Sequence, residues 1–113
     1  MVSLIINTTD FKDFTNQEGL SCVILKANWD KTSLKMSVIF DRVALRYQNQ
    51  IHFAKLDIDN FTDVVKAEKV GAIPEFLIYS NGKVVSRRHC TQETDLDNFL
   101  KKLVMEMGKE EDY

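Results

Sequence analysis

The chain has few of the residues on which redox and metal chemistry depend. Its 113 residues include two cysteines, Cys22 and Cys90, which lie far apart and form no Cys-x-x-Cys pair. Two cysteines are too few for a disulfide framework, so we expect free thiols in a reducing compartment. The sequence also has one proline, four glycines and no low-complexity tract, which argues against a linker and favours one domain.

An excess of one charge and long apolar runs are also missing. Fifteen lysines and arginines stand against seventeen aspartates and glutamates, giving a net charge of −2. Because no basic excess is present to neutralise a phosphate backbone, we expect no nucleic-acid partner. Residues 1–6 are apolar, but Asp10 and Lys12 follow too soon for a signal peptide, and no run is long enough to span a membrane. We therefore expect a cytoplasmic protein, with the nucleus as the alternative, and no membrane partner.

Hydrophobic patterning predicts alternating strands and helices. The continuous apolar run of residues 22–25 is typical of a strand buried on both faces, and apolar residues between 36 and 47 recur at helical spacing. Asn81-Gly82 is typical of a tight hairpin turn. The predicted strands are residues 4–6, 20–27, 51–58, 75–79 and 84–89. Four helices are predicted: one that starts at a cap on Thr8 or Thr9, one over residues 33–48, one that starts at a cap on Asn60, and one over residues 96–107 that ends at Gly108. This order predicts an α/β domain over residues 1–108, with helices on both faces of a mixed sheet and a short acidic tail at 109–113.

Several residues in this order resemble the thioredoxin family over nearly the whole chain. Trp29 follows the second predicted strand, directly before Asp30-Lys31-Thr32-Ser33 at the start of a long helix. An acidic pattern with Asp57 and Asp59 follows the third strand, and Ile73-Pro74 precedes the fourth. The resemblance implies a thioredoxin fold, a cis peptide bond before Pro74 and a groove that receives an extended peptide.

The dithiol of that family is missing from the matching positions. Family members carry two thiols, two residues apart, at the N-terminus of the long helix, where the helix dipole lowers the pKa of the first thiol. Asp30 stands in the place of the first thiol and Ser33 in the place of the second. Because neither side chain exchanges with a disulfide, no catalytic residue is predicted. Ile24 replaces a buried aspartate of the family, Val38 replaces its helix-kinking proline, and Cys90 replaces a glycine.

A second resemblance is local. Residues 29–36, Trp-Asp-Lys-Thr-Ser-Leu-Lys-Met, are similar to the Trp-Asp-Pro-Thr-Cys-Met-Lys-Met stretch of the small thioredoxin-fold protein of the spliceosome. That family also lacks the dithiol and works through protein contacts, although its members have a longer C-terminal region. This resemblance implies a splicing-type scaffold.

Single side chains of the expected groove have alternative roles. Trp29 either contacts a partner or packs on its own loop, where the family pattern joins its indole N–H to Asp59. Asp30 either caps the helix or ligates a metal, and we expect the cap because no histidine lies at ligand spacing. Cys90 is either an unreactive, half-exposed cysteine or a reactive thiol whose pKa is lowered by nearby cations. Cys22 is expected to be an inert core thiol.

The leading prediction is a redox-inactive thioredoxin-like protein that binds a protein or an extended peptide, with no enzyme activity expected. The alternative is a redox enzyme or thiol sensor that acts through Cys90, and a splicing-type scaffold is the third interpretation. No cofactor or metal is predicted, and the oligomeric state stays open. The basic residues at 83 and 87–89 either bind an acidic partner or protect an edge strand from pairing. The expected binding groove comprises Trp29, Asp30, Lys31, Thr32, Ser33, Asp59, Ile73, Pro74 and Cys90.

Overall fold

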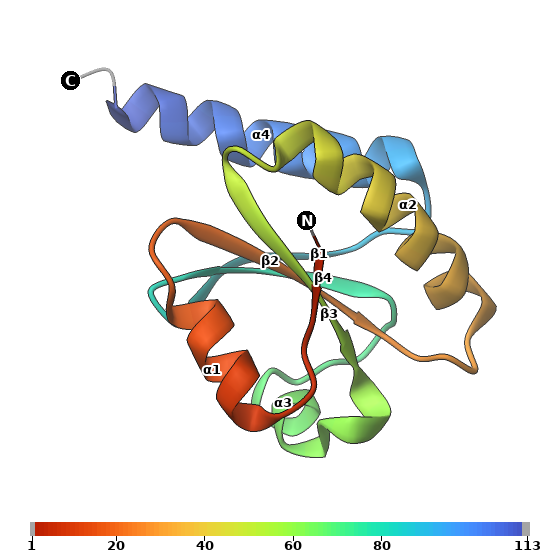
Figure 1. Ribbon diagram of the computed structural model, residues 1–113. Coiled ribbons are helices and arrows are strands. Elements are labelled where there is room, and N and C mark those ends of the chain that lie inside the picture. Colours follow the sequence, from red (N-terminus) through yellow and green to blue (C-terminus); the bar gives the residue numbers. More distant parts are fainter. Residues whose placement is uncertain (1, 112–113) are drawn as a thin grey trace.

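Residues 2–111 are described by the computed structural model, in which strands and helices alternate along the chain (Figure 1). The strands are β1 (Val2–Leu4), β2 (Leu20–Lys26), β3 (Ile51–Asp57), β4 (Glu75–Ser80) and β5 (Lys83–His89). The helices are α1 (Thr8–Asn16), α2 (Lys31–Tyr47), α3 (Thr62–Ala67) and α4 (Glu93–Glu111), and a short 3-10 helix, η1 (Ile58–Asn60), follows β3. None of the helices in this described part of the chain is long and apolar enough to cross a membrane.

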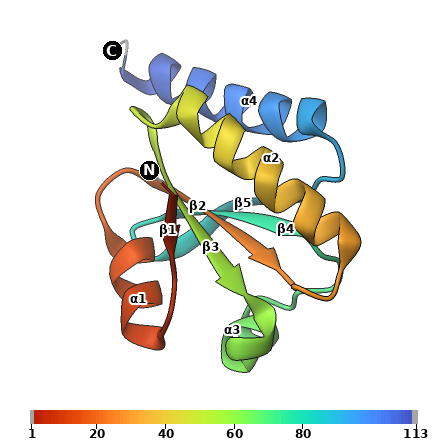
Figure 2. The same ribbon diagram turned by 45° about the vertical axis from the view of Figure 1, so that its right-hand side comes forward.

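The strands form one mixed sheet with the order β1-β3-β2-β4-β5. β1, β3 and β2 run parallel to one another, whereas β4 and β5 run antiparallel to their neighbours. α2 and α4 lie side by side on one face of the sheet, and α1 and α3 lie on the other (Figures 1 and 2). The predicted α/β class, a mixed sheet between two helical layers, is therefore confirmed.

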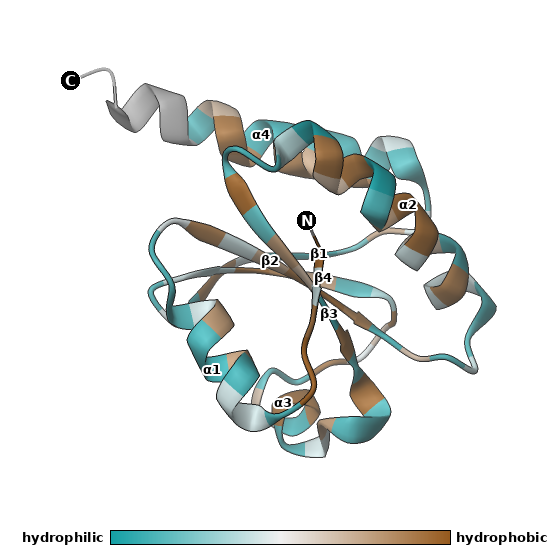
Figure 3. Ribbon diagram, in the orientation of Figure 1, coloured by the Kyte–Doolittle hydropathy of each residue, from teal (hydrophilic) through white to brown (hydrophobic). Residues whose placement is uncertain are grey.

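The central strand β2 supplies apolar side chains to both layers. Cys22 and Ile24 belong to the cluster under α2 and α4, whereas Val23 and Leu25 belong to the cluster under α1 and α3. All four side chains are fully buried. Burial on both faces explains why the run is continuous rather than alternating. α2 and α4 instead alternate hydrophobic and hydrophilic residues, as helices with one solvent-facing side do (Figure 3).

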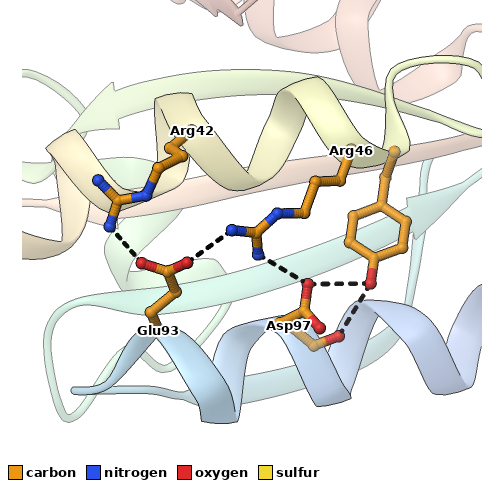
Figure 4. Close-up of polar contacts among 5 residues, drawn as sticks. Arg42, Arg46, Glu93 and Asp97 are labelled. Atoms are coloured by element: carbon orange, nitrogen blue, oxygen red, sulfur yellow. Dashed lines mark hydrogen bonds and ion pairs between the residues drawn. The ribbon is translucent and has the colours of Figure 1, made fainter.

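Ion pairs connect α2 to α4 on their solvent side (Figure 4). Arg42 contacts Glu93, and Arg46 donates to Glu93 at 2.8 Å and to Asp97 at 3.1 Å. The Tyr47 hydroxyl donates to Asp97 at 3.1 Å. Hydrogen bonds from Arg42 and then Arg46 lower the pKa of Glu93 below its ordinary value. Because these groups are partly exposed, each pair adds little stability, but the connected set holds the two helices in one register.

The β4–β5 hairpin contains the predicted Asn-Gly turn. Asn81 and Gly82 have φ angles of 52° and 81°, the left-handed values that a type I′ turn requires at both positions. The Gly82 N–H donates to the Thr15 carbonyl at 2.9 Å, which joins the turn to the end of α1. A Cβ atom at Gly82 would collide with the Asn16 side chain. Glycine is therefore favoured here by its positive φ angle, and a side chain would require Asn16 to move.

Several predicted element ends differ from the structure: among them, α2 begins at Lys31 rather than at residue 33, and α4 begins at Glu93 rather than at residue 96. The first strand lies at Val2–Leu4 rather than at residues 4–6, and Asn7, not Thr8 or Thr9, caps α1 by accepting from the Asp10 N–H at 2.9 Å. α4 continues through Gly108 to Glu111, because a glycine inside a helix costs only about 1 kcal/mol and does not by itself end it. The predicted acidic tail covers residues 109–113, of which four are glutamate, aspartate or lysine. Residues 109–111 belong to α4, and residues 112–113 lie outside the described residues.

The predicted cap of α3 is also wrong. Asn60 belongs to η1, and Phe61, which precedes α3, makes no side-chain capping hydrogen bond. The cap in this region is instead Asp57, whose carboxylate accepts from the Asp59 N–H at 3.0 Å and starts η1. The extra 3-10 turn displaces the start of the helix and brings two carboxylates into one tight loop.

Candidate functional site

The start of α2 follows the end of β2 through a short polar loop. Asp30 caps the helix: its Oδ2 accepts from the Ser33 N–H at 2.9 Å, and its own N–H donates to the Ala27 carbonyl at 3.2 Å. This is the capping role predicted from sequence, and it places a carboxylate at the positive end of the helix dipole. Lys31 is exposed and Thr32 is half-buried in the same first turn.

Trp29 is anchored and exposed at the same time. Its indole Nε1–H donates to Asp59 Oδ2 at 3.0 Å, which joins the loop after β2 to η1 after β3. The side chain is nevertheless 68% exposed. The hydrogen bond to Asp59 that the family resemblance implied is therefore present, and a large aromatic surface stays open beside the first turn of α2.

The structure adds two polar residues to this region that were not expected there, Lys26 and Asn28, and joins them to Asp57. Lys26 ends β2, Asn28 lies in the following loop and Asp57 ends β3; Lys26 donates to Asn28 at 2.8 Å, and Asn28 donates to Asp57 at 2.9 Å. A signal was present in the sequence, because Lys26 interrupts an otherwise apolar stretch between Leu25 and Ala27. A lysine inside a buried strand needs a polar partner, and the loop supplies it.

The peptide bond between Ile73 and Pro74 is cis, as the resemblance implied. Pro74 is buried and Ile73 is half-buried. The Pro74 carbonyl lies 2.8 Å from His89 Nδ1, so the loop before β4 is connected to the end of β5. The next residue, Glu75, is buried and forms an ion pair with Arg87 of β5. Two of the basic residues of β5 thus hold the Pro74 loop in place.

Cys90 lies directly after β5, and its surroundings correct two expectations. The residue is fully buried, in the cluster that includes Met36 of α2 and Leu96 of α4, rather than half-exposed. Burial raises the pKa of the Cys90 thiol to about 12, with Asp95 adding to the rise and Arg88 opposing it. The predicted lowering of the pKa is therefore wrong, because desolvation outweighs the one nearby cation.

The thiol is nevertheless close to α2 in space, although it is far from it along the chain. Lys35 Nζ, in the second turn of α2, donates to the carbonyl of Thr91 at 3.1 Å. His89 is connected to Pro74 on the other side. Cys90 therefore sits between a residue joined to the cis-proline loop and a residue joined to α2. Of the two thiols, Cys90 is the one whose chain neighbours are joined to both of these segments.

The other candidate groups have no dithiol chemistry. Ser33, at the position of the second family thiol, is fully buried, and its hydroxyl oxygen has no hydrogen-bond partner. Cys22 is a free, fully buried thiol whose pKa burial raises, with a further contribution from Cys90. Within residues 2–111, no three His, Cys, Asp or Glu side chains are grouped to hold a metal ion. Among the predicted groove residues, Cys90 is therefore the one that carries a thiol.

Comparison with known proteins identifies relatives over most of the chain. The family model described as Thioredoxin matches residues 2–102. Thioredoxin of Coprinus comatus is 29% identical over 103 residues, which cover 90% of this chain and 97% of that protein. Mitochondrial thioredoxin of Bos taurus is 32% identical over 97 residues, covering 84% of this chain and 58% of that protein. Oxidised thioredoxin from Plasmodium falciparum shares the fold, with a TM-score of 0.83 at 21% identity over 91% of this chain and 98% of that one.

These relatives correct the leading functional prediction. They are named thioredoxins, which are redox proteins, so the interpretations as a redox-inactive binding module or a splicing-type scaffold are wrong. The absence of thiols at positions 30 and 33 does not remove Cys90, the thiol on which the alternative rests. Redox action through a thiol, the alternative, agrees better with the comparisons. With its fold and with the family model matched over residues 2–102, the chain belongs to the thioredoxin family.

Proposed function

We propose that this thioredoxin-family chain takes part in thiol–disulfide exchange through one thiol, that of Cys90. The observation that carries the proposal is the position of Cys90 between His89, which is bonded to the Pro74 carbonyl, and Thr91, whose carbonyl is bonded to Lys35 of α2. The chain neighbours of Cys90 thus join the cis-proline loop on one side and the second turn of α2 on the other. Cys22, in the middle of the sheet, has no such position.

The proposed step transfers one sulfur bond. Because Cys90 is fully buried, a local opening must first expose the thiol, which then loses its proton to solvent. The thiolate attacks one sulfur of a partner disulfide. A new S–S bond forms to Cys90 while the original S–S bond breaks, and the released sulfur leaves as a thiolate that takes up a proton. Cys90 is oxidised, and the released half of the partner disulfide is reduced.

The residues around Cys90 favour a slow reaction that stops at the mixed disulfide. Asp30 and Ser33 supply no second thiol to displace the partner, so release needs a thiol from another molecule. The raised pKa of Cys90 also makes it a poor leaving group, which slows attack on the mixed disulfide. These properties suit a thiol sensor, or an enzyme that depends on an external thiol, better than a rapid dithiol catalyst.

The proposed partner is a protein with a disulfide in an extended segment. In the thioredoxin family, the backbone before this proline pairs with such a segment through main-chain hydrogen bonds, and Ile73 occupies that position here. The exposed ring of Trp29 adds apolar contact area at the same site. The groove predicted from sequence is thus retained in the proposal as the surface that delivers a disulfide to Cys90.

Reaction with oxidised glutathione tests the thiol. We expect native protein incubated at pH 8 to gain one glutathione, located at Cys90 by peptide mapping and intact mass. Cys90→Ser should gain none, whereas Cys22→Ala, the matched control, should still gain one. Preferential modification of Cys22, or modification only after denaturation, would refute the proposal.

A disulfide-bonded peptide tests the groove separately. Ile73→Asp places a charge beside the cis-proline and should reduce mixed-disulfide formation with the peptide several-fold. The same variant should react normally with oxidised glutathione, which is too small to need the groove. If both reagents react normally with Ile73→Asp, the partner does not use this loop; if neither does, the substitution has disturbed Cys90 itself.

A further inference from the structure

Lys26 is an unusual residue for the last position of a central strand. Its side chain is 9% exposed, and it lies beside Asp57 in the register of β2 and β3. Its ammonium group donates to Asn28 Oδ1 at 2.8 Å. A buried charge is costly unless it is hydrogen-bonded, so this contact fixes the Asn28 side chain strongly.

From Asn28, hydrogen bonds continue across the loop to Trp29. Asn28 Nδ2 donates to Asp57 Oδ2 at 2.9 Å, and Asp57 Oδ1 accepts from the Asp59 N–H at 3.0 Å. Asp59 Oδ2 in turn accepts from the Trp29 indole Nε1–H at 3.0 Å. The chain of contacts therefore starts at a buried strand residue and ends at an exposed aromatic ring.

The buried end sets the orientation of every later group. The ammonium group can only donate, so the Asn28 amide must present its oxygen to Lys26 and its NH₂ group to Asp57. Asp57 then offers its second oxygen to the Asp59 N–H, which starts η1 and directs the Asp59 carboxylate to the indole. Exposed hydrogen bonds are weak when each stands alone, but a connected network with one buried, charged end is held in one arrangement.

We propose that Lys26 is a positioning residue for Trp29, acting through Asn28, Asp57 and Asp59. It keeps the indole hydrogen-bonded and its exposed face presented beside the first turn of α2. Without Lys26 the Asn28 amide is free to rotate, the support for Asp57 weakens, and the indole leaves Asp59 more often. The proposal concerns this loop alone and does not depend on exchange at Cys90.

The chain allows a direct test because Trp29 is its one tryptophan. In ¹⁵N-labelled protein the indole N–H gives a single signal, and its exchange rate with solvent reports the hydrogen bond to Asp59. In Lys26→Met we expect exchange about fivefold faster, the fold-change that corresponds to losing one ordinary hydrogen bond of about 1 kcal/mol. Lys26→Arg, which keeps a charged donor, should restore much of the protection.

Lys55→Met is the matched control. Lys55 is also a partly buried lysine of the sheet, but its ammonium group bonds to Ser37 and Asp41 of α2, outside the network. It should leave indole exchange unchanged. If Lys55→Met accelerates exchange as much as Lys26→Met, the effect is general loosening and the proposal fails.

A second variant keeps the test decisive if Lys26→Met folds poorly. Asn28→Ala removes the next member of the network from an exposed loop, where a substitution leaves the core intact. It should accelerate indole exchange by a similar factor. Unchanged exchange in Asn28→Ala, or in a folded Lys26→Met, would overturn the proposal.

Discussion

Alkylation of Cys90 in the native protein is expected to be slow and steeply dependent on pH. The thiolate is the reacting form, and burial raises the pKa of this thiol from an ordinary 9.0 to about 12. That rise lowers the thiolate population at pH 7 by about a thousandfold, since each pKa unit is a factor of ten. Burial of the sulfur atom slows access by the reagent further.

Iodoacetamide labelling followed by peptide mapping measures the two cysteines separately. Between pH 7 and pH 10 the rate at Cys90 should rise about tenfold per pH unit without levelling off, whereas glutathione in the same tube should level off above about pH 9. Cys22, also fully buried, should be labelled still more slowly. A Cys90 rate that equals that of glutathione at pH 7 would refute the reasoning.

Charge variants next to Cys90 test the cause of the shift. Asp95 raises the thiol pKa and pairs with Arg88, which lowers it, so Asp95→Asn should accelerate labelling and Arg88→Ala should slow it. Glu93→Gln is the control, because Glu93 also lies in the first turn of α4 but pairs with α2. If the wild-type labelling rate levels off near pH 9 at a low value, labelling proceeds through an opened state in which the thiol has its ordinary pKa. Asp95→Asn would then change the labelling rate only by changing the stability of the closed state.

Three further predictions concern stability, each measured by urea unfolding. The buried thiols Cys22 and Cys90 have raised pKa values, so the folded state holds protons that the unfolded state loses above about pH 9. Their contribution to stability should be constant below that pH and fall above it, so an increase in stability above about pH 9 would contradict the raised pKa values. Asp30→Ala removes the cap of α2 and should cost about 1 kcal/mol, with Asp30→Asn recovering most of it; equal losses in both would show that charge rather than capping matters. Gly82→Ala should cost more than about 1 kcal/mol of stability, because alanine is strained at this positive φ angle and its Cβ atom collides with Asn16. Combining it with Asn16→Ala should recover only the part of the loss that comes from the collision.

Local patterns in the sequence determined most of the architecture. The continuous apolar run of β2, the helical spacing in α2 and the Asn81-Gly82 turn each depend on residues a few positions apart, and all are present as predicted. The cap at Asp30 depends on one helix turn and was predicted for the same reason. The hydrogen bond from Trp29 to Asp59 joins residues that lie far apart in the sequence, so no local pattern predicts it. This bond and the cis peptide bond before Pro74 were expected from the family resemblance instead.

Only the tertiary structure decided the properties of Cys90 and Lys26. The residues just before Cys90 are charged and exposed, so local pattern predicts a surface thiol, whereas α2 and α4 close over it and raise its pKa. Lys26 is the opposite case, because its charge predicts a surface position. It is buried because β2 is covered on both faces, and Asn28 of the next loop accepts a hydrogen bond from its ammonium group. Burial and desolvation depend on which distant elements cover a residue, and pKa values and the cost of a buried charge depend on burial in turn.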